Sequence, residues 1–198
     1  MLFRSGILSE KLNVPTISTG NILRAAMKAG TPIGLQAKAY VEAGKLVPDE
    51  IVIGIVEERL SEPDCANGYI LDGMPRTIPQ AEALQAGGVE IDVALSIEIS
   101  DEEIVERMSG RRTCHDCGAS FHTTDNPPKV TDVCDNCGGE LTRRHDDDPE
   151  IVRARLETYH EETEPLKHYY AELGKLKTVN SQPILAHTTE AVFRALGI

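Results

Sequence analysis

Two Cys-x-x-Cys pairs restrict what this chain can fold into more than any other feature of its sequence. The pairs are Cys114 with Cys117 and Cys134 with Cys137; sixteen residues separate them, and a glycine follows each pair. This spacing is typical of four thiolates around a tetrahedral zinc ion, in a closed site that leaves no coordination position open for chemistry. Two disulfides are the alternative, which a reducing cytoplasm disfavours. We therefore predict a structural Zn2+ site.

The segment 110–147, which contains both pairs, has little helical periodicity, and we expect it to form an inserted subdomain. Around it, strands are expected at 16–18, 69–72, 93–99 and 176–180, and helices at 6–12, 21–29, 34–43, 50–60, 100–109, 149–173 and 188–196. Pro165 is expected to break the helix that contains it, and Asp49 to cap the helix that follows it. Strands separated by helices predict an α/β fold with a parallel sheet and crossover connections.

The charge and hydropathy of the chain argue against two kinds of partner, nucleic acids and membranes. Its 32 acidic and 20 basic residues give a net charge of −12, which argues against a broad nucleic-acid surface because such a surface needs clustered basic residues. The longest apolar run, residues 51–56, is far shorter than a membrane span, and no hydrophobic signal region follows Met1. We expect a cytoplasmic protein that contacts no membrane.

Arginines gather on both sides of the inserted segment. They are Arg107, Arg111, Arg112, Arg143, Arg144, Arg153 and Arg155. A single arginine is usually a solvated surface charge, but guanidinium groups bind phosphate oxygens with two prongs, and a closing lid that carries several could neutralise a phosphoryl group in transfer. Arg24 and Arg76 form a second candidate phosphate pair, because each follows an expected strand and ligands bind at the carboxyl ends of parallel strands.

Asp72 ends an expected buried strand and precedes Gly73. A carboxylate at this place can hold the water shell of Mg2+, or it can be an ordinary turn residue, since Asp-Gly turns are common. The residues alone leave both interpretations open.

Six stretches of the chain together resemble the zinc-containing, long-lid type of bacterial adenylate kinase. In chain order they read ISTGNILRAA, GKLVPDE, GYILDGMPRTIPQAE, GRRTCHDCGASFHTTDNPP, DDDPEIVRARL and ETEPLKHYY. The resemblance implies a P-loop NTPase-like parallel-sheet core with helices on both faces (1–17, 48–109 and 148–198), an AMP-binding insertion (18–47) and a zinc-ribbon-like lid (110–147). It also implies the reversible conversion of ATP and AMP to two ADP, with Mg2+ bound alongside ATP, by a monomer that binds no nucleic acid.

The resemblance assigns roles to individual residues on the AMP side. AMP would be bound by Thr19, Arg24, Lys45, Leu46, Val47, Gly73, Arg76 and Gln80. Within this set, Arg24 and Arg76 would grip the phosphate, and Gln80 would read the edge of the adenine.

On the ATP side, the resemblance implies that Arg107 stacks on the adenine and that Arg111 reaches the phosphates. The catalytic set would be Arg76, Arg111, Arg144, Arg155 and Asp72, with Asp72 facing Mg2+. The lid hinge would contain Asp146 and Asp147, and the metal ligands would be Cys114, Cys117, Cys134 and Cys137. Phosphoryl transfer needs positioning and charge neutralisation more than proton transfer, which agrees with a set rich in arginine.

The printed chain departs from the family at its start. The family begins with an apolar strand and a Gly-x-x-Gly-x-Gly-Lys loop directly before the helix that contains Ser9 to Leu12, and Met1 stands about where the loop lysine falls. Without that loop the phosphates lack a cradle of backbone amides, and without that strand two neighbouring strands lack a partner. We therefore expect impaired activity of this chain. The alternatives are a non-catalytic, zinc-stabilised AMP-binding remnant and a zinc-ribbon nucleic-acid binder, the latter disfavoured by the net charge.

Overall fold

Parallel strands form the centre of the molecule. The computed structural model describes residues 4–198; residues 1–3, at the start of the predicted core segment 1–17, lie outside that part. Four strands form two parallel pairs, β1 with β2 and β3 with β7. Their bounds are β1 (Thr16–Ser18), β2 (Ile70–Asp72), β3 (Ala94–Glu98) and β7 (Leu176–Asn180). Because helices connect the paired strands, the predicted α/β fold class with parallel strands is confirmed.

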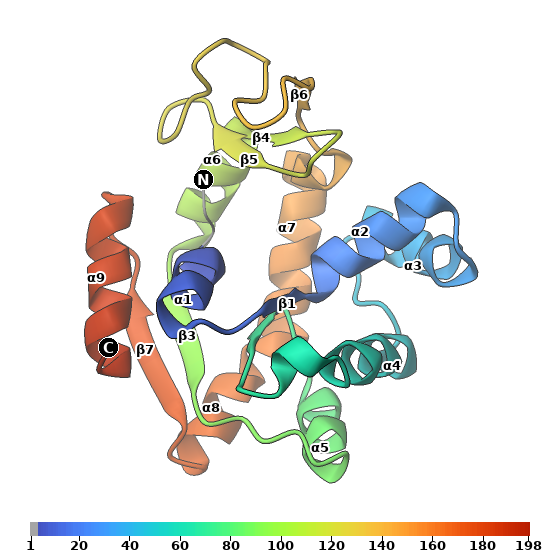
Figure 1. Ribbon diagram of the computed structural model, residues 1–198, viewed down its shortest axis with the longest axis vertical. Helices are drawn as coiled ribbons and strands as arrows, with labels where there is room; N and C mark the ends of the chain where they lie inside the picture. Colours follow the sequence, from blue (N-terminus) through green and yellow to red (C-terminus); the bar gives the residue numbers. More distant parts are fainter. Residues whose placement is uncertain (1–3) are drawn as a thin grey trace.

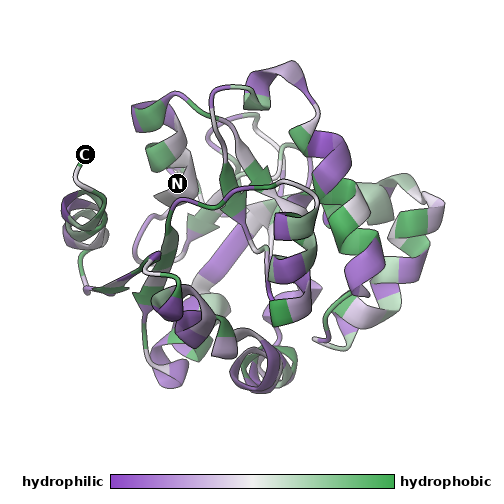
Figure 2. Ribbon diagram, turned by 90° about the horizontal axis from the view of Figure 1, so that it is seen from below, coloured by the Kyte–Doolittle hydropathy of each residue, from purple (hydrophilic) through white to green (hydrophobic). Residues whose placement is uncertain are grey.

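Helices surround the strand pairs (Figure 1). They are α1 (Arg4–Leu12), α2 (Thr19–Ala29), α3 (Pro32–Glu42), α4 (Asp49–Leu60), α5 (Ile78–Ala86), α6 (Asp101–Gly110), α7 (Pro149–Thr158), α8 (Pro165–Glu172) and α9 (Leu185–Leu196). Figure 2 shows hydrophobic and hydrophilic bands alternating along the helices, as expected of helices with one buried face. In the described part of the chain, no helix is long and apolar enough to cross a membrane.

Hydrophobic side chains connect the two strand pairs. Within residues 4–198, β2 and β3 belong to separate two-stranded sheets. Leu8 of α1 is buried in one cluster with Ile70 of β2 and with Leu95 and Ile97 of β3. In this part of the chain, side-chain packing therefore joins β2 to β3 where a continuous sheet would use backbone hydrogen bonds.

Helices α2 and α3 form a tightly packed pair that shares a core with the helices beside it. A Cβ atom at Gly34 of α3 would lie 2.2 Å from the backbone oxygen of Ala26 in α2, so only glycine allows this approach. Leu23 of α2 is buried in the same hydrophobic cluster as Val56 of α4 and Leu84 of α5. This packing orients one face of α2 toward the turn that follows β2.

The cysteine-containing segment has its own sheet and its own small core. β4 (Arg111–Cys114), β5 (Ser120–His122) and β6 (Leu141–Thr142) form an antiparallel sheet in the order β5-β4-β6. Phe121 and Leu141 are buried in a cluster with Cys114 and Cys134. Figure 1 shows this sheet beyond the ends of α6 and α7, away from the parallel strands.

Several elements differ from the sequence-based expectations, and helix α5 was not predicted at all. The helix predicted at 149–173 is divided into α7, a π-helical turn (Tyr159–Thr163) and α8, and α8 begins at the proline expected to cause the break. The last helix begins at Leu185, three residues before the predicted start at 188. Asp49 does not cap α4: Pro48 is the N-cap, and the carboxylate of Asp49 instead accepts hydrogen bonds from Thr77 and Gln80.

Candidate functional site

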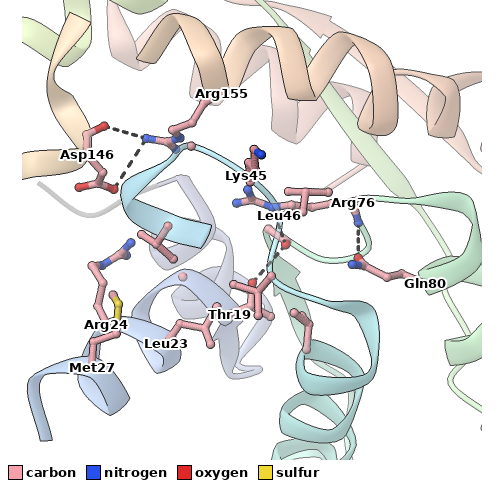
Figure 3. A pocket seen from close by; sticks show the side chains of 16 residues that line it. Thr19, Leu23, Arg24, Met27, Lys45, Leu46, Arg76, Gln80, Asp146 and Arg155 are labelled. Carbon is pink, nitrogen blue, oxygen red and sulfur yellow. Dashed lines mark hydrogen bonds and ion pairs between the residues drawn. The ribbon is translucent and has the colours of Figure 1, made fainter. Parts of the chain in front are cut away.

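The central cleft lies between α2, the loop at residues 44–47, the turn after β2 and the side of α7 (Figure 3). About 680 Å³ of space lies between its walls, part of it continuous with the open solvent. The cleft is lined by all eight residues predicted to bind AMP, namely Thr19, Arg24, Lys45, Leu46, Val47, Gly73, Arg76 and Gln80. Asp146 and Arg155 complete the wall on the side of α7.

The turn after β2 fixes the positions of Thr19 and Arg76. The Thr19 hydroxyl donates to the Gly73 carbonyl at 3.1 Å, and Arg76 Nε donates to the same oxygen at 3.0 Å. Gly73 has a φ of 80°, and a Cβ atom there would lie 3.1 Å from Arg76 Nη2 and 3.3 Å from Thr19 Oγ1. The backbone conformation favours glycine at this position, and a larger residue would also push against the side chains of Arg76 and Thr19.

Gln80 contributes a nearly buried amide to the cleft, with 2% of its surface exposed. Its Oε1 accepts a 2.7 Å hydrogen bond from the backbone N–H of Arg76, and its Nε2 donates a 2.6 Å hydrogen bond to Asp49 Oδ1. Gln80 was expected at this site from the family resemblance, but Asp49 was expected only to cap a helix, so its pairing with Gln80 was not predicted.

Guanidinium groups concentrate positive charge in the cleft. Burial and the nearby charge of Arg144 lower the pKa of Arg24 to about 10, and burial also lowers the pKa of Arg76 and Arg155. All three side chains stay charged at neutral pH, so they are held close together against their mutual repulsion. Such a cluster favours an anion with several oxygens, because each guanidinium can donate two parallel hydrogen bonds.

Asp146 and Asp147 pair with arginines of the cysteine-containing segment, residues 110–147. The carboxylate of Asp147, whose side chain is 0% exposed, accepts two hydrogen bonds from Arg111, the one from Nε measuring 2.9 Å. The carboxylate of Asp146 accepts two hydrogen bonds from Arg144, the one from Nε measuring 2.8 Å. Its Oδ2 also lies 3.7 Å from Arg155 Nη1. Burial opposes the ionisation of Asp146, but the hydrogen bond and charge of Arg144 and the charges of other arginines outweigh it, so its pKa is lowered. The Arg-Arg-His-Asp-Asp-Asp run was the available sequence signal for the pair of Arg144 with Asp146.

Other predicted site residues lie outside the lining of the central cleft. They are Arg107, Arg111, Arg144, Asp72 and Asp147. Arg107 Nη1 donates to the hydroxyl of Ser181 at 3.2 Å, so this guanidinium is oriented by the segment after β7. Asp72 is exposed at the end of β2, where the Ser5 hydroxyl donates to its Oδ2 at 3.2 Å. This accessible carboxylate is compatible with either role expected for it.

The four clustered cysteines form a group that could hold a metal ion. Their sulfur atoms lie within 4.8 Å of one another; Cys114 Sγ is 3.4 Å from Cys137 Sγ, and Cys117 Sγ is 3.6 Å from Cys134 Sγ. These separations are too long for disulfides, whose S–S bond is about 2.05 Å. Backbone hydrogen bonds, chiefly from Cys117, lower the pKa of Cys114 to about 7, whereas the pKa of Cys117 and of Cys137 is raised beside the neighbouring thiols, so Cys114 is the first of these three to become a thiolate. The disulfide alternative does not describe this segment.

A family model and several curated relatives all place this chain beside adenylate kinases. A family model described as adenylate kinase matches residues 4–175. The adenylate kinase of Acetivibrio thermocellus is 53% identical over 195 residues, which cover 96% of this chain and 90% of that protein. The adenylate kinase of Caldicellulosiruptor bescii is 54% identical over 195 residues, covering 96% of this chain and 91% of that protein. The adenylate kinase of Ruminiclostridium cellulolyticum is 50% identical over 196 residues, covering 97% and 92%.

Proposed function

The chain belongs to the adenylate kinase family, and from this premise we propose that the central cleft holds AMP while a phosphoryl group is transferred to it from ATP. Members of this family are nucleoside monophosphate kinases, which interconvert ATP and AMP with two ADP. The observation that carries the proposal is the arrangement of the central cleft, in which Arg24 and Arg155 lie on one side and Gln80 on the other (Figure 3). A nucleoside monophosphate has this same polarity, with an anionic phosphate at one end and a hydrogen-bonding base edge at the other.

In this proposal, the arginines act by position and charge. Arg24 and Arg76 bind the phosphate of AMP, and Arg111, Arg144 and Arg155 neutralise the charge that develops on the transferring phosphoryl group. The carboxylates of Asp146 and Asp147 hold these guanidinium groups in place before the nucleotides bind. Preorganised charges need no rearrangement at the moment of reaction, which is the main way that proteins accelerate phosphoryl transfer.

Mg2+ supplies further charge neutralisation when it arrives with ATP. We assign Asp72 to hold the water shell of that ion, because its carboxylate is exposed at the carboxyl end of β2, next to the central cleft residue Gly73. Arg107 is the proposed contact of the ATP adenine. We propose that the protein acts as a monomer.

We assign zinc to the four-cysteine group of the lid segment. Zn–S bonds of about 2.3 Å in a tetrahedron place neighbouring sulfur atoms about 3.8 Å apart, close to the measured 3.4 Å and 3.6 Å. Four thiolates fill the coordination shell, so the ion holds the lid segment in shape and takes no part in chemistry. Elemental analysis of the purified protein should find one zinc per chain, and metal-free protein with four freely reactive thiols would contradict the assignment.

The test of the proposed function is ADP formation from AMP and MgATP, compared between Arg155→Ala and Arg153→Ala. Both residues belong to α7, but Arg155 lines the central cleft whereas Arg153 is exposed. We expect at least a hundredfold lower kcat/KM for Arg155→Ala, as is usual for lost transition-state donors, and little change for Arg153→Ala. Equal activity of the two variants would contradict the assignment, and AMP binding without ADP formation would support the non-catalytic alternative.

A further inference from the structure

The side-chain amide of Gln80 is held from two sides, and we propose that Asp49 makes the central cleft select adenine over hypoxanthine by holding this amide in one orientation. The inference rests on the proposed AMP site and adds a positioning residue to it. Asp49 does not line the central cleft. It acts through Gln80, whose Nε2 donates a hydrogen bond of 2.6 Å to Asp49 Oδ1.

The orientation of the amide follows from the chemistry of its two partners. An ionised carboxylate only accepts hydrogen bonds, so Asp49 Oδ1 requires the amide nitrogen beside it. A backbone N–H only donates, so the N–H of Arg76, at 2.7 Å, requires the amide oxygen beside it. A reversed amide would place two donors together on one side and two acceptors together on the other. Either partner alone favours one orientation of the Gln80 amide, and the two together are compatible only with that orientation.

Asp49 is itself held in place by a third residue. Its Oδ2 accepts a hydrogen bond of 3.2 Å from the hydroxyl of Thr77, the N-cap of α5. The oxygen of that hydroxyl accepts from the backbone N–H of Gln80 at 3.2 Å, which leaves its proton free to point at Asp49. Thr77 and Gln80 are 8% and 2% exposed, so water competes little for these bonds. The first turn of α4 is in this way locked to the first turn of α5.

A locked amide presents a fixed order of donor and acceptor to a base. Gln80 uses one of its two Nε2 hydrogens on Asp49 and one Oε1 lone pair on Arg76, and the remaining hydrogen and lone pair are available to a base in the cleft. Adenine complements this pair, because its N1 accepts and its 6-amino group donates. Hypoxanthine has a donating N1–H and an accepting O6, so it would need the reversed amide. The site therefore rejects hypoxanthine by leaving polar groups unpaired, which is a strong form of discrimination.

Asp49→Asn tests this inference, with Glu50→Gln as its matched control. An asparagine amide can present either its oxygen or its nitrogen to Gln80, so it permits reversal without changing the shape of the side chain. Glu50→Gln removes the same charge from the same first turn of α4, at an exposed residue. We would measure the Kd of AMP and of IMP by calorimetry, which requires no turnover.

We expect Asp49→Asn to lower the preference for AMP over IMP about tenfold or more, whereas Glu50→Gln leaves the preference unchanged. If Asp49→Asn weakens the binding of AMP and of IMP equally, Asp49 has only a structural role and the inference is wrong. If that variant does not fold, Thr77→Ala replaces it; it frees the carboxylate but keeps its charge, and it should lower the same preference by a smaller factor. An unchanged preference in Thr77→Ala would then overturn the inference.

Gln80→Ala separates a failure of the inference from a failure of the proposed site. If Gln80→Ala leaves the preference for AMP over IMP intact, Gln80 does not read the base and the proposed AMP site is wrong. If Gln80→Ala abolishes the preference but Asp49→Asn retains it, the site stands and the orienting role of Asp49 is rejected.

Discussion

Replacement of Gly73 by alanine should have two effects, strain in the backbone and steric contact with neighbouring side chains. The first is backbone strain, because a φ of 80° costs an alanine about 1–2 kcal/mol. The second is contact, because the new Cβ atom would lie 3.1 Å from Arg76 Nη2 and 3.3 Å from Thr19 Oγ1. Both groups must move by a few tenths of an ångström. Since Arg76 is a proposed phosphate ligand, that movement should weaken AMP binding.

Gly88→Ala is the matched control, because Gly88 has a φ of 83° and nothing within 4 Å of a Cβ atom placed there. It carries the strain without the contact. Both variants should lose about 1–2 kcal/mol of stability, which corresponds to a fall in Tm of about 2–8 °C for a chain of this size. Only Gly73→Ala should also weaken the binding of AMP, by about tenfold or more, as expected when a hydrogen bond to a charged group is disturbed.

Thermal unfolding followed by circular dichroism would give the two Tm values, and calorimetry would give the two affinities. Equal AMP affinity in Gly73→Ala and Gly88→Ala would refute the reasoning, because it would mean that the approach of Gly73 to Arg76 does not position the guanidinium for AMP. A much larger loss of stability in Gly88→Ala than in Gly73→Ala would refute the assumption that strain is the shared term.

Three further predictions concern charge and metal. Removal of the metal by a chelator should lower the Tm and make four thiols reactive toward a thiol reagent, with both changes reversed by added zinc. Asp147→Asn should lower the free energy of unfolding in denaturant by about 3–5 kcal/mol, because it leaves the partly buried guanidinium of Arg111 without its counter-charge. The control Asp92→Asn, at an exposed residue, should change the free energy of unfolding by no more than about 0.5 kcal/mol. Hydrogen bonds to Glu164 and Asp101 raise the pKa of His160, so its stabilisation should be complete below the unfolded pKa of about 6.5 and be lost as pH rises through the folded value. His160→Gln should remove this part of the pH dependence of the Tm, and an unchanged profile would contradict the assignment.

Local patterns in the sequence were sufficient for most of the elements. The strands at 16–18 and 176–180 were predicted with the bounds that the structure has, because each is a short segment between clear helical patterns. Helix ends were less accurate, since the first and last turns depend on what they pack against. The predicted cap at Asp49 was wrong for this reason: its carboxylate finds better partners on a helix that lies 31 residues further along the chain.

The sequence by itself predicted the α/β class and grouped the four cysteines, because periodicity and spacing are local properties of the chain, and its resemblance to a known family named the residues that line the central cleft. Only the tertiary structure decided how those residues are paired. Arg111 and Asp147 are 36 residues apart in the chain yet form a buried ion pair, and the amide of Gln80 takes its orientation from partners on two different elements. Such pairings depend on the directions in which separate helices present their side chains, and those directions are set by the packing of the whole molecule.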